Sequence, residues 1–149
     1  MTLSLETLAT QYIAGKPVEP TMKELMDFVE WVDKRFFFIK RYVDFTKDEV
    51  SPDEMEYVWD QTARLRVSTA HNEHPYWSEE INARFRAIHD WDHIQGGFTF
   101  GWQGELTAAG YAMSTAPDSI KWVLWSEIGL QACAAGFTGA FQPQKLVKV

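Results

Sequence analysis

The stretch Ser78–Gly97, SEEINARFRAIHDWDHIQGG, decides the fold. Ser78 is a residue type that caps helix N-termini, and the pair Gly96-Gly97 is typical of a helix end. Between them, apolar and polar residues recur with the period of an α-helix. The stretch therefore predicts a helix over residues 79–95.

Four polar residues of this helix, Asn82, Arg86, His89 and His93, are spaced so that they share one narrow face. Apolar residues flank that face on both sides, so the polar row is predicted to be buried, and a buried polar row needs partners. The spacing of the two histidines is the one by which a helix offers two imidazoles to a single metal ion. An alternative is that hydrogen bonds alone satisfy the two rings.

Three helices are predicted before this one. Each begins at a capping residue, and two carry further N-terminal signals: Glu24 three residues after Thr21 forms a capping box, and Pro52 follows Ser51 at a first helical position. The loop 69–77 separates the third helix from the fourth. The expected helices cover residues 4–14, 21 to about 45, and 51 to about 68.

After the fourth helix, residues 98–104 alternate aromatic and small side chains and predict a loop or a short extended turn. Two more helices are expected over 105–113 and 117–135. The predicted fold class is all-α: a single-domain helical bundle of about five to six helices over residues 1–149, with this aromatic and glycine loop between the fourth and fifth. Residues 1–20 form an N-terminal arm in this prediction, and residues 137–149 form a C-terminal tail.

Composition excludes several classes of protein. The chain of 149 residues is 46% hydrophobic, which suits a packed core, and its net charge is -7 with no basic cluster. Duplex nucleic acid is therefore an unsuitable partner. No apolar run reaches the roughly 20 residues that span a bilayer. Cys133 stands alone, so no internal disulfide forms, and we expect a cytoplasmic location, the host cytoplasm if the chain is phage-encoded.

Two carboxylates on later helices are candidate partners for the histidines. Glu127, followed one turn later by Gln131, lies on an otherwise apolar helix face, where an unpaired charge costs several kcal/mol. Glu105 shares a face with small alanines that allow another helix to approach, although an acid in a first turn also serves the helix dipole. The predicted metal ligands are therefore His89, His93, Glu105 and Glu127.

Further site residues are assigned by their chemistry. Asp90 is a candidate general base, a candidate ligand, or a residue that orients a histidine ligand. Arg86 is a candidate partner for a charged group of the substrate. Alternatively, it forms a purely structural salt bridge with a glutamate. Glu105 is a second candidate base. The predicted catalytic set is thus Asp90, Arg86 and Glu105. The predicted binding set is Asn82, Gln131, His74, Trp102 and Phe98.

These residues carry a resemblance to a family of largely uncharacterised phage-encoded proteins, over about residues 74–132. The family resembled often has glycine before the second histidine, where this chain has Asp92. The resemblance implies phage origin and no particular activity. The shared pattern is Asn82-x-x-Phe85-Arg86-Ala87-x-His89-Asp90-x-x-His93, then Gly104-Glu105, then Glu127-x-x-x-Gln131.

The pair His89-Asp90 is also similar to the metal-binding pair of HD-class nucleotide triphosphohydrolases, which are all-helical. This resemblance implies that His89 and Asp90 are ligands, and that His93 and Glu105 serve the phosphate chemistry. It also implies an upstream histidine ligand, either His71 or His74. HD-class enzymes usually place that histidine farther away.

The sequence thus favours a metal-dependent hydrolase, a phosphohydrolase acting on a nucleotide or another small phosphate compound. The cofactor would be a divalent ion: zinc, manganese, magnesium or iron. One alternative is a ferritin-like di-iron or di-manganese protein, although the Glu-x-x-His spacing is missing. Another is a non-enzymatic phage interaction protein with a buried polar network. A homo-oligomer is compatible with all three hypotheses.

Overall fold

The computed structural model describes residues 4–149, which group into two compact units. Unit 1 contains residues 4–27 and 98–149, and unit 2 is the continuous segment Phe28–Gly97. Helix α2 (Met22–Ile39) contributes residues to both units. The expectation of one domain stays a prediction.

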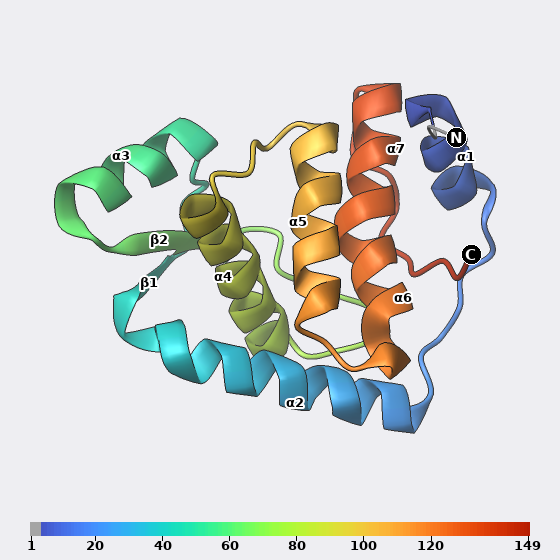
Figure 1. Ribbon diagram of the computed structural model, residues 1–149, viewed down its shortest axis with the longest axis horizontal. Helices are drawn as coiled ribbons and strands as arrows, with labels where there is room; N and C mark the ends of the chain where they lie inside the picture. The colour runs from blue at the N-terminus through green and yellow to red at the C-terminus, as the bar shows by residue number, and fades with distance from the viewer. Residues whose placement is uncertain (1–3) are drawn as a thin grey trace. The chain divides into compact units, whose positions relative to one another are not determined.

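Unit 1 is entirely helical in its regular structure. In Figure 1 the chain of this unit runs through α1, then α5, and then a last helical run that comprises α6 and α7. The bounds of these elements are α1 Leu5–Ala14, α5 Trp102–Ser114, the 3-10 turn η2 Asp118–Ile120, α6 Lys121–Leu124, the π-helical segment η3 Trp125–Leu130, and α7 Gln131–Thr138.

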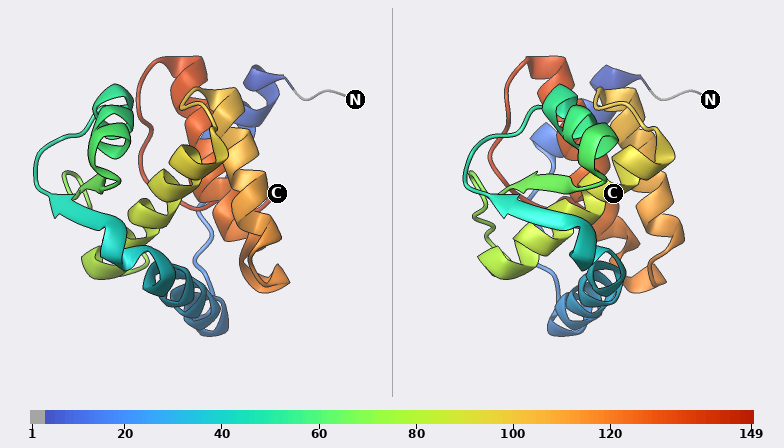
Figure 2. Two further views of the ribbon diagram at one scale, coloured as in Figure 1. Left: turned by 60° about the vertical axis from the view of Figure 1, so that its left-hand side comes forward. Right: turned by 90° about the vertical axis from the view of Figure 1, so that its left-hand side faces the viewer.

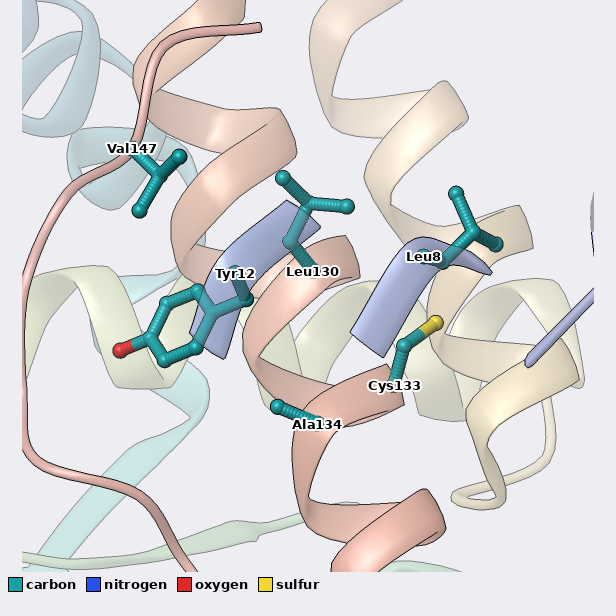
Figure 3. Close-up of a cluster of buried hydrophobic side chains, with 6 residues drawn as sticks. All are labelled: Leu8, Tyr12, Leu130, Cys133, Ala134 and Val147. Atoms are coloured by element: carbon teal, nitrogen blue, oxygen red, sulfur yellow. The ribbon is translucent and has the colours of Figure 1, made fainter. Parts of the chain in front are cut away.

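The core of unit 1 lies between α1 and the last helical run. Ser4 caps α1 by accepting from the backbone N–H of Thr7 at 3.1 Å, and the helix buries Leu8 and Tyr12. Figure 3 shows these two side chains in one cluster with four residues from the C-terminal third of the chain. Helix α1 therefore packs against α7. The other members of the cluster are Leu130, Cys133, Ala134 and Val147.

The C-terminal stretch has no helix or strand, yet it contributes to this core. Leu146 is fully buried and Val147 is 3% exposed. The Tyr12 hydroxyl donates to the carbonyl of Pro143 at 3.0 Å, and the Val147 N–H donates to the Ser126 hydroxyl at 2.8 Å. The predicted tail is thus fixed to α1 and to the last helical run by hydrogen bonds as well as by burial.

Unit 2 holds a small parallel sheet among helices. Strands β1 (Val43–Thr46) and β2 (Leu65–Ser68) pair in register from Val43 with Leu65 to Thr46 with Ser68. Helix α3 (Pro52–Thr62) connects them, as a parallel pair requires a crossover. Figure 2 shows the two strands side by side. The remaining elements are the 3-10 turn η1 (Lys40–Tyr42) and α4 (Glu79–Gly96).

The second and third helices are shorter than predicted, because a strand follows each of them. Helix α2 ends at Ile39 and α3 at Thr62, whereas the sequence predicted helix to about 45 and 68. The apolar residues Val43 and Phe45 continue the helical pattern, but pairing with a segment distant in sequence makes them a strand. The chain is mainly helical, as predicted, and departs from the all-α expectation at these strands. The bundle arrangement stays a prediction.

The predicted capping box at the start of α2 is confirmed. The Thr21 N–H donates to the Glu24 carboxylate at 2.9 Å, and the Glu24 N–H donates to the Thr21 hydroxyl at 3.1 Å. The bond from Thr21 is the main cause that lowers the pKa of Glu24, and the Trp122 indole N–H adds a second bond at 2.7 Å. Because the folded pKa is depressed, this contribution to stability is present at neutral pH and is lost as pH falls through the folded pKa.

Among residues 4–149, no helix is both long enough and apolar enough to cross a bilayer.

Candidate metal centre

His89 and His93 lie together on α4. The helix is capped at its start by the Ser78 hydroxyl, which accepts from the Ile81 N–H, and at its end by Gly97 with φ of 68°. The Nε2 atoms of the two histidines are 3.2 Å apart, and their rings are nearly perpendicular at 86°. His93 is 2% exposed and His89 is half-buried. The predicted histidine pair is therefore formed, with one nitrogen of each ring directed at the other.

The 3.2 Å separation has two chemical interpretations. Zinc binds imidazole nitrogen at about 2.0–2.1 Å with tetrahedral angles, so two nitrogens on one ion lie about 3.3–3.4 Å apart. The distance between the two Nε2 atoms is close to that value. A hydrogen bond, in which one ring donates and the other accepts, has a similar length. The distance is compatible with a shared metal ion and with a direct hydrogen bond. The two histidines form a metal site only in the first case.

Arg86 lies one turn before His89 and is half-buried. Its Nη1 donates to the Ala70 carbonyl at 2.6 Å, which ties α4 to the loop that follows β2. Burial lowers the pKa of Arg86, and the negative charge of Asp90 opposes that shift. The guanidinium is still protonated at any ordinary pH. A cation in such a water-poor setting attracts an anion more strongly than an exposed one does.

Asn82 and His74 have packing contacts in unit 2. The Asn82 amide oxygen accepts from the Trp77 indole N–H at 2.9 Å, and its amide nitrogen donates to the Asn72 side chain at 2.9 Å. His74 stacks on Trp77 with ring centroids 3.6 Å apart. Both residues thus order the loop 69–77, which the sequence predicted as a loop. Their role in binding stays a prediction.

His71, the other candidate upstream ligand, lies at the surface of unit 2. Its side chain is 87% exposed, and its Nε2 is 3.3 Å from the Glu49 carboxylate. Its backbone φ is 52°, which belongs to the left-handed region. A ligand in a buried site is normally held by its surroundings, and His71 has little such support.

Asp92 forms a buried ion pair that the sequence did not indicate. Its two carboxylate oxygens accept from Arg35 of α2 at 2.6 and 2.8 Å, and its side chain is 4% exposed. A bidentate pair of this kind fixes the separation of two helices. Asp92 precedes His93, so the pair also fixes the turn of α4 that carries the histidine. The partner is distant in sequence, and no local pattern identifies it.

Glu105 lies in the first turn of α5 and is half-buried. The helix begins at Trp102, earlier than predicted, so residues 102–104 are helical and the loop that precedes them is shorter. An acid in a first turn is favoured by the helix dipole, which is the structural alternative for this residue. Its role as ligand or base stays a prediction.

Gly104 is required by a close approach inside unit 1. A Cβ at this position would lie 1.9 Å from the Thr99 carbonyl oxygen, which is impossible without movement of the backbone. We expect Gly104→Ala to lower the free energy of unfolding by about 1–3 kcal/mol, because the loop must move away from α5. Chemical denaturation measures this. Gly110→Ala is the matched control, since nothing lies within 4 Å of a Cβ there. Equal stabilities for the two variants would contradict the prediction.

Glu127 lies in the π-helical segment η3 and is bound by a residue of the C-terminal stretch. The Gln144 amide donates to both carboxylate oxygens of Glu127, at 2.8 and 2.9 Å. Gln131 accompanies Glu127 as predicted, because it also bonds to Gln144, at 3.2 Å. Short π-helical segments occur often at functional sites. The sequence did not indicate Gln144, and its hydrogen bonds to Glu127 are evident only in the structure.

Trp102 and Phe98, predicted to line a binding site, have aromatic and apolar neighbours in unit 1. Trp102 packs against the cluster around Tyr12 and Leu130, and Phe98 lies 6.0 Å from the Tyr111 ring. These contacts are sufficient to explain why both positions are aromatic. Binding roles for them stay predictions.

No family model, curated protein or solved structure matches this chain.

Proposed function

We propose that this protein is a metal-dependent hydrolase whose divalent ion is bound by His89 and His93. The observation that carries the proposal is the 3.2 Å separation of their Nε2 atoms, in a pair whose second member is buried. Glu105 is the third ligand in this proposal, as the sequence argument suggested. Together the three residues offer two nitrogens and one oxygen.

This donor set suits a catalytic ion more than a structural one. Three protein ligands leave a coordination position for water, whereas structural zinc sites use four. Imidazole and carboxylate ligands accept zinc, manganese and iron. When bound, the ion would lower the pKa of a coordinated water to near 7 and polarise the group under attack.

Arg86 and Asp90 are assigned to the substrate and the proton. The half-buried guanidinium of Arg86 would pair with a phosphate oxygen, and its remaining N–H groups suit that geometry. Asp90, the residue after His89, would accept the proton of the attacking water. The attraction between Asp90 and Arg86 supports their assignment to one site.

A nucleotide is one of the small phosphate compounds that this proposal includes, and the aromatic residues of unit 2 do not select it. Trp91 packs against Tyr42 and Trp59, with ring centroids 5.3 and 5.5 Å away. It lies about 200° around α4 from His89, and so on the opposite face of the helix. The substrate is therefore proposed as a small phosphate compound.

Glu127, the fourth ligand that the sequence predicts, is left out of the coordination shell in this proposal, because a fourth protein ligand would occupy the position needed for water. Its carboxylate is occupied by the Gln144 amide, which would have to release it. Glu127→Gln is therefore expected to reduce metal affinity less than Glu105→Gln. Isothermal titration of both variants with zinc ranks the two carboxylates.

The experiment that tests the proposal is a screen of nucleotides and phosphoesters with zinc, manganese and magnesium, combined with metal analysis of the purified protein. Stoichiometric metal and turnover that Asp90→Asn abolishes would support it. A folded protein that binds no metal would instead favour a hydrogen-bonded packing network, and the protein would act by binding alone. Iron with a visible charge-transfer band would favour the carboxylate-bridged redox alternative.

A further inference from the structure

Strand β1 has an open edge. Within residues 4–149 the sheet consists of β1 and β2 alone. In a parallel ladder, alternate residues direct their backbone groups to opposite sides. The Thr69 N–H donates to the Thr46 carbonyl at 2.7 Å. The backbone groups of Thr46, and those of Asp44 two residues before it, therefore point toward β2. Phe45 therefore directs its N–H and its carbonyl away from β2.

This edge is protected by its short length of four residues and by Lys47 directly after it. The strand itself lacks the proline, bulge or uncompensated charge that many edge strands carry. The single charge of β1 is Asp44, and Arg64 binds both of its oxygens, at 3.0 and 2.6 Å. Phe45 is 45% exposed and stacks on Phe36 of α2, with ring centroids 6.0 Å apart. The edge thus combines outward-directed backbone groups with an exposed aromatic ring.

The charges on the two sides of β1 are opposite in sign. Lys40 and Arg41 form a basic flank before the strand. After it, Asp48 and Glu49 outweigh Lys47 and form a flank of net negative charge. A second copy that pairs in the antiparallel direction places each basic flank beside the acidic flank of its partner. A parallel copy would place like charges together. The exposed rings of Phe37 and Phe38, 63% and 75% accessible, add apolar area at the adjacent end of α2.

We propose that the protein forms a two-fold symmetric dimer in which β1 pairs antiparallel with β1 of a second copy, with Phe45 at the axis. The Phe45 N–H of each copy then donates to the Phe45 carbonyl of the other. In this register the outward backbone groups of Phe45 are paired directly, and the oppositely charged flanks lie side by side. The two small sheets become one four-stranded sheet. The proposal is independent of the metal site.

Charge reversal tests the antiparallel arrangement. Lys40→Glu/Arg41→Glu places acid opposite acid, and Asp48→Lys/Glu49→Lys places base opposite base. We expect wild type to be dimeric in sedimentation equilibrium, and each variant alone to dissociate at least 10-fold more readily. A mixture of the two variants restores opposite charges at both ends, so it is expected to form a heterodimer. Wild type that stays monomeric at millimolar concentration, or a mixture that does not pair, overturns the proposal.

Cysteine cross-linking tests the register. Hydrogen-bonded antiparallel partners have Cα atoms about 5.5 Å apart, within the range of a disulfide, so Phe45→Cys is expected to form a covalent dimer under mild oxidation. Thr46→Cys is the control, since two copies of residue 46 lie about 8 Å apart in this register. The native Cys133 does not interfere, because burial raises the pKa of its thiol to about 11. Cross-linking through position 46 and not through 45 would exclude this register.

Discussion

His93→Ala is expected to lower the affinity for zinc by at least about 100-fold. Replacing a residue that only hydrogen-bonds a ligand lowers metal affinity by about 10–100-fold, and this substitution removes a ligand itself. His93 is 2% exposed, so the variant also leaves a cavity on α4. His89→Ala, at a half-buried position, is expected to have the same effect on affinity with less effect on folding. Isothermal titration measures the affinity, and circular dichroism verifies that both variants are folded.

His71→Ala is the matched control for these variants. It removes an imidazole from the same unit, but one that is 87% exposed and paired with Glu49. Its zinc affinity is expected to equal that of wild type. If the His71 variant loses zinc while the His93 variant keeps it, the metal centre assigned to α4 is wrong. If all three variants bind as wild type does, the contact between His89 and His93 is a hydrogen bond and nothing more.

Asp92→Ala is expected to lower the free energy of unfolding by about 3–5 kcal/mol. The change leaves Arg35, which is 19% exposed, without the two carboxylate bonds at 2.6 and 2.8 Å. A buried charge that loses its partner costs more than the pair contributed. Urea denaturation measures the effect.

The double variant Arg35→Met/Asp92→Leu tests the cause. Replacing both members of a buried ion pair by apolar residues of similar volume often leaves stability unchanged. The double variant is therefore expected to recover most of the unfolding free energy that Asp92→Ala loses. A single variant within about 1 kcal/mol of wild type would show that solvent compensates the arginine.

Helix starts could be predicted because their signals are local. Ser4, Thr21, Ser51 and Ser78 each precede a helix, and their side chains accept from backbone N–H groups as the capping rules require. Helix ends were less predictable. Ala63 ends α3 with φ of 51°, a conformation that alanine rarely adopts and that its sequence does not indicate. The strands followed from pairing between segments distant in sequence, which no single window contains.

In the candidate site, too, local features could be predicted from the sequence and contacts between distant segments could not. The spacing of His89 and His93 is a property of one helix, so their proximity followed from the sequence. The partners of Asp92 and Glu127 lie on other elements, and neither Arg35 nor Gln144 stands in a recognisable motif. Charge on an apolar face indicates that a partner is needed but does not identify it.

The discontinuity of unit 1 has a consequence for synthesis. Its core combines α1 with Leu146 and Val147, which the ribosome adds among the last residues of this sequence. Unit 2 is one uninterrupted segment and is complete much earlier. Chains emerge from the ribosome N-terminus first. Leu8 and Tyr12 of α1 therefore stay uncovered until the C-terminal stretch has been synthesised. Helix α1 is therefore synthesised before unit 2 but acquires its native neighbours after it.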